Sequence, residues 1–301
     1  MRMMFVGDIN LGEYYTGFGH GPKSFAEKNL IFSEVKDLLV QADYVLGNLE
    51  APITSILACR GDPEDQVLRA PASSAAMLRD AGFSALQIAN NHMVQHGKDI
   101  FNETVELLSG AGIDVIGKVA EPHVVELGGM TFAFFAASDV PDNTNKSQTQ
   151  YQRLDEDFLL RVERAAKNFD HVVVMLHWGL EESTVPLQYQ RKLASRLKAA
   201  GVRAIVGSHP HLFYEVEVDE SFVCAYSLGN FVFDLCWDSR MLQSGVLDIT
   251  FTKEHISCRI WPITIKEEGC FPTIVGESLE VKEYCQIYNH GSPLRLSLIH
   301  I

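Results

Sequence analysis

The chain has 301 residues, of which 47% are hydrophobic and 21% charged, and its formal net charge is -14. This length is sufficient for one large α/β domain, or two smaller ones, with a sizeable buried core. The negative charge and the lack of a basic stripe argue against non-specific binding to nucleic acid or anionic lipid. We therefore expect no nucleic-acid partner.

The first residues run directly into an apolar segment, without a basic region and a long apolar stretch ending in a cleavage site, so we expect no signal peptide. No run of about 18 apolar residues is present, so we expect no membrane segment in this chain. These features predict a cytoplasmic protein, unless a signal or anchor has been removed. The six cysteines form no C-x-x-C pair, which predicts reduced thiols rather than a zinc ribbon.

The hydrophobic pattern of the first half predicts alternating strands and helices. Strands are expected at 3–6, 43–46, 85–88 and 113–116. Helices are expected up to about residue 39, at 71–81 and at 98–109, and the last two end at glycines. A hairpin is expected at 124–137, because Gly128 and Gly129 allow the positive φ that a two-residue turn needs.

The second half continues the alternation after a polar loop at 138–153, which we expect near the site. Helices are predicted at 154–168 and 186–200, strands at 171–176 and from 202, a hairpin at 213–226, and strand-like runs at 246–251 and 256–265. No linker or repeat marks a boundary. We therefore expect one domain over residues 1–301, with about 236–301 as its β-rich C-terminal extension.

The segment 202–211 is an apolar strand that stops at a glycine and then presents His209 and His211. Side chains two residues apart share a face only in extended backbone. Pro210 disfavours a helix and pushes the residues before it toward the extended region. We expect an extended segment whose two imidazoles converge, although such a pair by itself is equally consistent with surface loop histidines.

Five predicted strands end at a glycine or small residue that is followed by a side chain able to bind a metal ion. In open α/β sheets the functional crevice lies beyond the carboxyl ends of the strands, so we expect these loops to meet at one edge. The candidate ligands are Asp8, Asn10, Glu50, Asn91, His177, His209 and His211.

This set of oxygen and imidazole donors, without a thiolate, suits Mn, Fe, Zn or Ni better than a structural zinc site. It is too large for one tetrahedral ion, whereas two ions that share a carboxylate would use all of it. Paired ions about 3.5–4 Å apart clamp a phosphoryl oxygen and activate a bridging water. The set therefore predicts two divalent metal ions as cofactors.

Short motifs occur along the chain in the order G-D-x-x-L-G, N-L-E-x-P, A-N-N-H, H-W-G, G-x-H-P-H and S-L-G-N-F. Over about residues 3–235 this series resembles the CapA branch of the calcineurin-like metallophosphoesterase superfamily, which is named for poly-gamma-glutamate capsule synthesis. The resemblance implies a four-layered α/β fold, a β-sandwich flanked by helices. Spacing alone does not distinguish that fold from a doubly wound sheet.

The resemblance also implies roles for the motif residues. It places Asp8 and His211 on one ion, and Glu50 as the bridging ligand. It places the other ion on Asn91, His177 and His209. His92 is implied to act as a catalytic residue beside the leaving group.

Two positions depart from the superfamily pattern. Its first motif is D-x-H, but here the third position is Asn10, a weaker ligand, which puts the first metal site in doubt. His20 is a possible replacement, although a solvated loop histidine is the simpler interpretation. An aspartate often lies three residues after the A-N-N-H histidine, and here Gln95 takes its place; it can accept a hydrogen bond from His92 but stabilises a positive charge less well.

Further residues near these motifs have simpler interpretations. We expect Trp178 to pack beside the site, and Glu181 and Glu182 to be solvated. The candidates for substrate binding are Asn230 and Arg60, and Arg69 is a second possible phosphate contact.

Three functions are consistent with these residues. The first is a dinuclear metal hydrolase that cleaves a phosphoester, such as a sugar or nucleotide derivative, through a metal-bound hydroxide. The alternative is a capsule polyglutamate synthesis or assembly factor that binds or processes an anionic polymer with little phosphatase activity. The third is a metal-stabilised binding protein without catalysis. The substrate would be a small phosphorylated compound or an anionic polymer, and the sequence names neither the metal nor the oligomeric state.

Overall fold

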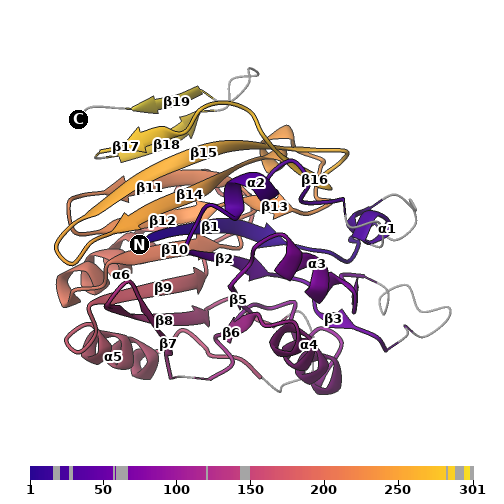
Figure 1. Ribbon diagram of the computed structural model, residues 1–301, viewed down its shortest axis with the longest axis horizontal. Helices are drawn as coiled ribbons and strands as arrows, with labels where there is room; N and C mark the ends of the chain where they lie inside the picture. The colour runs from indigo at the N-terminus through magenta and orange to yellow at the C-terminus, as the bar shows by residue number, and fades with distance from the viewer. Residues whose placement is uncertain are drawn as a thin grey trace.

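Two large β-sheets form the centre of the structure, which is a computed structural model (Figure 1). It describes residues 1–15, 21–26, 30–56, 58, 67–119, 121–142, 150–282, 284–288 and 295–298. None of the helices within these ranges is long and apolar enough to cross a membrane.

The first sheet has the strand order β16-β15-β14-β1-β2-β5-β6. Its members are β1 (Arg2–Ile9), β2 (Tyr44–Leu49), β5 (Ala85–Gln87), β6 (Asp114–Ile116), β14 (Gln243–Phe251), β15 (Ile256–Lys266) and β16 (Phe271–Ile274), with β13 (Asn230–Val232) beside β1 and β17 (Leu279–Val281) beside β15. Strands β1, β2, β5 and β6 are parallel, as is β13 to β1. Their carboxyl ends therefore lie at one edge.

The second sheet has the order β19-β18-β11-β12-β10-β9-β8-β7. Its members are β7 (His123–Leu127), β8 (Met130–Ser138), β9 (His171–His177), β10 (Ala204–Ser208), β11 (Phe213–Val218), β12 (Val223–Leu228), β18 (Tyr284–Tyr288) and β19 (Arg295–Leu298). Strands β8, β9, β10 and β12 are parallel. A small separate pair joins β3 (Ile53–Thr54) and β4 (Ala70–Pro71).

Short helices connect and cover the sheets. They are α1 (Pro22–Ala26), α2 (Lys36–Leu39), α3 (Ser74–Asp80), α4 (Lys98–Gly110), α5 (Glu156–Ala165), α6 (Gln188–Ala200) and the 3-10 helix η1 (Ser239–Leu242). Helix α5 begins where the Asp155 carboxylate accepts a hydrogen bond from the Phe158 amide, and α6 ends at Gly201 in the left-handed conformation.

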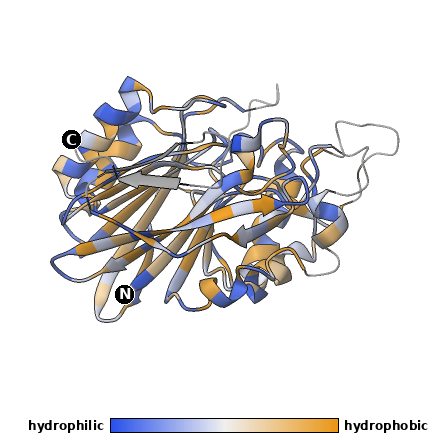
Figure 2. Cartoon of the chain, turned by 90° about the horizontal axis from the view of Figure 1, so that it is seen from above, coloured by the Kyte–Doolittle hydropathy of each residue, from blue (hydrophilic) through white to orange (hydrophobic). Residues whose placement is uncertain are grey.

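Strand β9 shows how the layers pack, because its successive side chains belong to different cores. Val173 and Met175 join the core that also contains residues of the first sheet and of α2, α3 and α4. Val172 and Val174 join a second core with α5 and α6. The strands are mostly hydrophobic in Figure 2 because both faces are covered. The predicted four-layered β-sandwich flanked by helices is thus confirmed. The doubly wound sheet, which spacing alone left possible, is not the fold of this chain.

The region expected as a β-rich extension contributes to both sheets. Strand β14 pairs antiparallel with β1 from Arg2 opposite Thr250 to Phe5 opposite Leu247. Strand β18 pairs with β11 of the second sheet. The C-terminal strands therefore build onto the same sheets that carry the motifs.

Candidate metal centre

The motif side chains meet at one edge of the sandwich, as the strand-end pattern predicts. Strands of both sheets contribute to this edge: β1, β2 and β5 from the first, β9 and β10 from the second. The buried side chains are Asp8, Glu50, Asn91, His92, His177, His209, His211 and Asn230. The parallel strands thus deliver them to one place.

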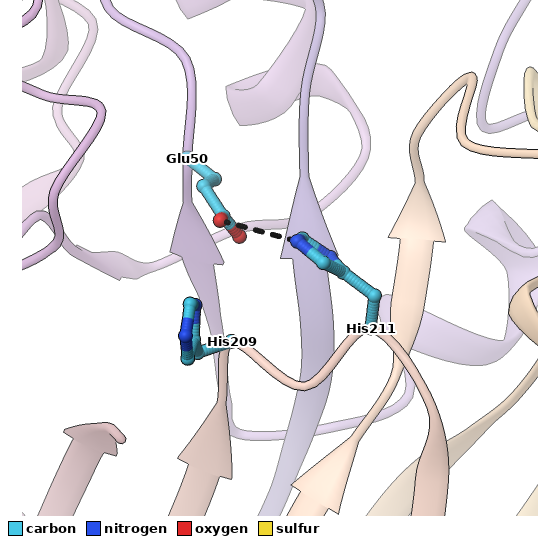
Figure 3. A group of neighbouring side chains, drawn as sticks. All are labelled: Glu50, His209 and His211. Carbon is cyan, nitrogen blue, oxygen red and sulfur yellow. Dashed lines mark ion pairs between the residues drawn. The ribbon is translucent and has the colours of Figure 1, made fainter. Parts of the chain in front are cut away.

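Glu50 lies at the centre of this group. Its Oε1 is 3.8 Å from the Nε2 atoms of His92, His177 and His211. Oε2 accepts a hydrogen bond from Asn48 Nδ2 at 3.1 Å, whereas Oε1 is buried and has no hydrogen-bond partner within the described part of the chain. One carboxylate oxygen is therefore anchored while the other is open toward the imidazoles, and Figure 3 shows the pair with His211.

Within the part of the chain that the structure describes, two groups of donors have the spacing of a metal site. Glu50, His209 and His211 form one, and Asp8, Glu50 and His177 form the other, with the ligand atoms of each group within 4.8 Å of one another. His209 Nδ1 is also buried without a hydrogen-bond partner among the described residues. Buried polar atoms without partners are costly, and a cation would satisfy them. The residues present therefore fit bound metal, and Glu50 belongs to both groups as a shared ligand would.

These groups divide the ligands differently from the roles implied by the resemblance. His177 groups with Asp8, although its Nε2 is also 2.8 Å from Asn91 Oδ1. Asp8 Oδ2 lies 3.4 Å from His211 Nδ1, so it is close to the partner that the resemblance gave it. The division of the ligands between two ions remains a prediction.

Burial sets the charge state of two imidazoles in the site. It lowers the pKa of His177 well below its ordinary value, and the neighbouring His209 lowers it further. It also lowers the pKa of His209 to about 3, with a further contribution from His211. Both rings are therefore neutral near pH 7, which is the form that binds metal.

The acidic side of the site shows the complementary effect. Burial raises the pKa of Glu50 well above its ordinary value, and the adjacent Asp8 charge adds to this. Burial also acts to lower the pKa of His211, but the hydrogen bond and charge of Asp8 outweigh it and the pKa is raised. A bound cation would stabilise the ionised carboxylates in this buried position.

Asn48 is a site residue that the sequence analysis missed. Its Nδ2 donates to Asp8 Oδ1 at 2.8 Å as well as to Glu50. Its Oδ1 accepts from Gln87 Nε2 at 2.6 Å and Asn90 Nδ2 at 3.0 Å, which fixes the orientation of the amide. Asn48 therefore positions both carboxylates. Its place in N-L-E-x-P, two residues before Glu50 on a strand, was the available signal.

His92 borders the same gap from the loop after β5. Its Nδ1 lies 3.0 Å from Gln95 Oε1, so the hydrogen bond expected of Gln95 is confirmed. Burial lowers the pKa of His92 to about 4, and the Gln95 hydrogen bond opposes this only in part. One ring nitrogen is thus held by Gln95 while the other lies beside Glu50.

The backbone of the H-P-H segment differs from expectation. His209 and His211 have φ angles of 98° and 59°, so the prediction of extended backbone is wrong at both histidines. The chain turns sharply after β10, and such φ values strain a residue other than glycine. The amide of His209 donates to Asp8 Oδ2 at 3.3 Å, which helps hold the turn. The ring centroids of the two imidazoles are nevertheless only 6.2 Å apart. Figure 3 shows both rings near Glu50.

The family model for the bacterial capsule synthesis protein PGA_cap matches residues 2–235. The chain belongs to this family. It is 32% identical over 295 residues to the PGA biosynthesis protein CapA of Bacillus subtilis (strain 168), across 92% of this chain and 75% of that protein. It is 30% identical over 268 residues to the capsule biosynthesis protein CapA of Bacillus anthracis, across 82% of this chain and 64% of that protein, so it spans less than two thirds of the latter's length.

Solved structures with a similar fold are more distant. A 5'-nucleotidase from Candida albicans SC5314 has a TM-score of 0.47 and 10% identity, across 89% of this chain and 52% of that one. Vps29 of Chaetomium thermophilum has a TM-score of 0.35 and 9% identity, across 97% and 99%. These similarities are too low to inform the function of this PGA_cap member.

Asn10, the departure at the first motif, makes hydrogen bonds through both ends of its amide, and its role as a metal ligand stays a prediction. Its Nδ2 donates to Asp234 Oδ1 at 3.1 Å, and its Oδ1 accepts from the Gly12 amide at 2.8 Å. Both ends of the amide are therefore used. His20 and Arg60 lie outside the described residues.

The remaining candidates lie around the centre. Asn230 Oδ1 is 2.9 Å from His211 Nδ1, and Asn230 Nδ2 donates to the Met241 carbonyl at 3.2 Å. Asn230 therefore orients the His211 imidazole. Its predicted contact with substrate would compete with one of these two hydrogen bonds. Trp178 is fully buried, as expected of packing, and donates to the Tyr226 carbonyl. Arg69, the second possible phosphate contact, is buried, whereas Glu181 and Glu182 are exposed, as expected of solvated side chains.

Proposed function

We propose that this PGA_cap member is a metal-dependent hydrolase of the phosphoester type that uses two divalent ions of the Mn, Fe or Zn kind. The observation that carries the proposal is the buried Glu50 Oε1, which has no hydrogen-bond partner among the described residues and lies 3.8 Å from each of three imidazole nitrogens. When bound, paired divalent ions at such a site polarise a phosphoryl oxygen and activate a water for in-line attack.

The residues of the chain supply the ligands and the proton. Asp8, Glu50 and the three buried histidines His177, His209 and His211 would hold the ions, and Asn91 would complete the set. His92 would transfer a proton to the leaving-group oxygen from beside Glu50, with Gln95 orienting its ring. Burial keeps this imidazole neutral, so the negative charge of a bound phosphate would be needed to stabilise its protonated form. Asn48 would keep the two carboxylates in position.

A second candidate function has support from the curated relatives, both named for capsule or PGA biosynthesis. In that case the site would bind or process an anionic polymer such as polyglutamate, with little phosphatase activity. The two candidates share the metal centre and differ in the substrate.

The metal centre is tested by Glu50→Ala and His209→Ala. Both variants should lose metal, measured by elemental analysis, and should melt at a lower temperature, because an ion that binds only the folded state stabilises it. Glu254→Ala and His255→Ala are matched controls, since these side chains are exposed. Unchanged metal content and melting temperature in both site variants would refute the site assignment.

The substrate is tested with the metal-loaded protein. A panel of sugar phosphates, nucleotides and p-nitrophenyl phosphate should show metal-dependent phosphate release that Glu50→Ala abolishes. If the protein binds or cleaves oligo-γ-glutamate but releases phosphate from no ester, the proposed phosphoester hydrolase activity is contradicted and the capsule function is favoured.

A further inference from the structure

Aromatic rings from two segments far apart in the sequence gather where the chain leaves β1 and β13. The ring centroid of Tyr14 lies 5.2 Å from that of Tyr15 and 6.2 Å from that of Trp237, and Tyr15 and Trp237 are 6.4 Å apart. Tyr14 is 42% exposed and Trp237 is 52% exposed. Aromatic side chains bury large areas in most folds, so a half-exposed cluster indicates a binding surface.

The topology places this aromatic cluster (Tyr14, Tyr15 and Trp237) at the rim of the site. Strands β1 and β13 are parallel neighbours, with Asp8 opposite Asn230, so the segments 11–15 and 233–237 leave the same sheet edge side by side. The Phe233 ring lies 5.0 Å from the His211 ring between centroids. Trp237 follows Phe233 by four residues, so their Cα atoms are at most about 14 Å apart.

A buried carboxylate holds the cluster in place. Asp234 accepts hydrogen bonds from the backbone amides of Tyr14 at 2.8 Å and Tyr15 at 2.9 Å. It also accepts from Asn10 Nδ2 at 3.1 Å, two residues from Asp8. The backbone that carries the tyrosines is therefore tied to the strand of a metal-site residue, and such preorganisation reduces the cost of binding a ligand.

The exposed area indicates a small ligand rather than a protein. A fully buried aromatic side chain covers about 150–250 Å², so the two half-exposed rings offer on the order of 200 Å². A stable protein partner covers about 800 Å² on each side. The surface is thus about the size of one or two rings.

Nearby charge disfavours an anionic polymer on these rings. Asp238 follows Trp237 directly and is paired with Arg240. Burial raises the pKa of the preceding Cys236 thiol, and the Glu268 charge raises it further, so Glu268 also lies in this neighbourhood. Because Arg240 neutralises Asp238, repulsion of a polyanion would come from the Glu268 carboxylate, and an uncharged ring would not be repelled.

We propose that Tyr14, Tyr15 and Trp237 form a subsite that stacks on the flat face of an uncharged ring in the leaving group of the phosphoester. The shared chemistry is a ring attached to a phosphate, from either a sugar or a nucleobase. The inference rests on the proposed function, since the phosphate would lie at the metal centre while the ring reaches the aromatic cluster.

The experiment measures binding by calorimetry to the full chain loaded with Mn²⁺. The probes are glucose 1-phosphate, adenosine 5'-monophosphate and glycerol 3-phosphate, which has no ring. Trp237→Ala and Tyr14→Ala should each bind a ring-bearing phosphate about 5- to 150-fold more weakly, from the usual contribution of one stacked ring. Glycerol 3-phosphate should bind equally to all proteins. Leu160→Ala on α5 is the control, because its side chain is 45% exposed but lies on another element.

The outcomes separate the possible sources of the ring and the possible failures. Preference for glucose 1-phosphate indicates a sugar, and preference for the nucleotide indicates a base. The inference is overturned if the unaltered protein binds ring-bearing phosphates no more tightly than glycerol 3-phosphate. It is also overturned if both variants bind ring-bearing phosphates as the unaltered protein does, or if their affinity for glycerol 3-phosphate falls by the same factor. Oligo-γ-glutamate is a fourth probe, and the inference is also overturned if Trp237→Ala weakens the binding of this probe alone. The binding measurement does not require turnover. Ring binding that depends on Trp237 but is not followed by hydrolysis would therefore refute the proposed hydrolase function and support the aromatic subsite.

Discussion

At the scale of single residues, hydrogen bonds fix the outer atoms of side chains whose inner atoms face the centre of the site. Glu50 has Oε2 on Asn48 and Oε1 without a partner among the described residues. His92 has Nδ1 on Gln95 and Nε2 near Glu50. Hydrogen bonds on the outer atoms fix the direction of the inner ones, which is how neighbouring groups orient metal ligands.

His92 is the residue whose role is most sharply testable. His92→Ala should keep the metal and fold normally, yet lower kcat about 10²–10⁴-fold on an ester with a poor leaving group, because proton transfer to that group is lost. On p-nitrophenyl phosphate the loss should be smaller, since that leaving group needs little protonation. Steady-state kinetics on both substrates checks this.

The same kinetic measurements can contradict the proposed role of His92 in proton transfer. Equal turnover of His92→Ala and the unaltered protein on both esters would assign His92 a structural part in the loop after β5. Loss of metal in this variant would instead make His92 a ligand, and elemental analysis of the purified protein distinguishes the two.

At the scale of elements, close backbone contacts hold the strand ends together. A Cβ at Gly7 would lie 1.8 Å from the Gly229 carbonyl oxygen. The next residue, Asp8, donates its amide to the same oxygen at 2.9 Å. Glycine at position 7 therefore lets β1 approach the segment that enters β13, and this contact places Asp8 beside Asn230.

Gly7→Ala should separate these strands, because the obstacle is backbone rather than a movable side chain. We expect the free energy of unfolding to fall by about 1–3 kcal/mol or more, as it does in overpacked cores. The metal content should also be lower. Gly110→Ala is the matched control: a Cβ there meets nothing within 4 Å, and the residue lies at the end of α4. Its stability should be unchanged or slightly higher. Urea unfolding of both variants is the measurement, and similar stabilities would contradict the argument.

At the scale of the whole molecule, the interface between the sheets contains a buried histidine away from the metal centre. His171 at the start of β9 is fully buried, stacks on Phe132 with centroids 4.8 Å apart, and has no ring hydrogen bond among the described residues. Burial lowers its pKa to about 4; Arg203 and the N-terminus also lower it, while Asp170 and a backbone contact at Thr252 raise it. The folded protein thus keeps this ring neutral where an unfolded chain would protonate it.

This difference predicts a loss of stability in acid. Above pH 6.5 the ring is neutral in both states and contributes nothing. As the pH falls from about 6.5 to 4, only the unfolded chain takes up the proton, so His171 should reduce the free energy of unfolding by up to about 3 kcal/mol. His171→Phe should remove this part of the pH dependence, measured as the difference between the two proteins in urea unfolding at pH 7.5 and pH 4.5. Parallel pH profiles would contradict the prediction.

Much of the fold and most of the candidate site could be predicted from the order of the residues. Hydrophobic periodicity located most of the strands and the longer helices, because local burial patterns follow the period of each element. The strand-end motifs identified Glu50 and the histidines of the centre, since parallel strands bring their carboxyl ends together whatever the exact sheet order.

Features that depend on distant partners could be found only in the folded chain. Spacing could not separate a sandwich from an open sheet, because both bury the same apolar strands on two faces. It could not show that Asn10 bonds to Asp234, 224 positions later. It predicted extended backbone at His209 and His211, since neighbour sterics favour it, whereas the packed site holds both at positive φ. Long-range hydrogen bonds and packing outweigh local preference at such positions, and a linear pattern does not contain them.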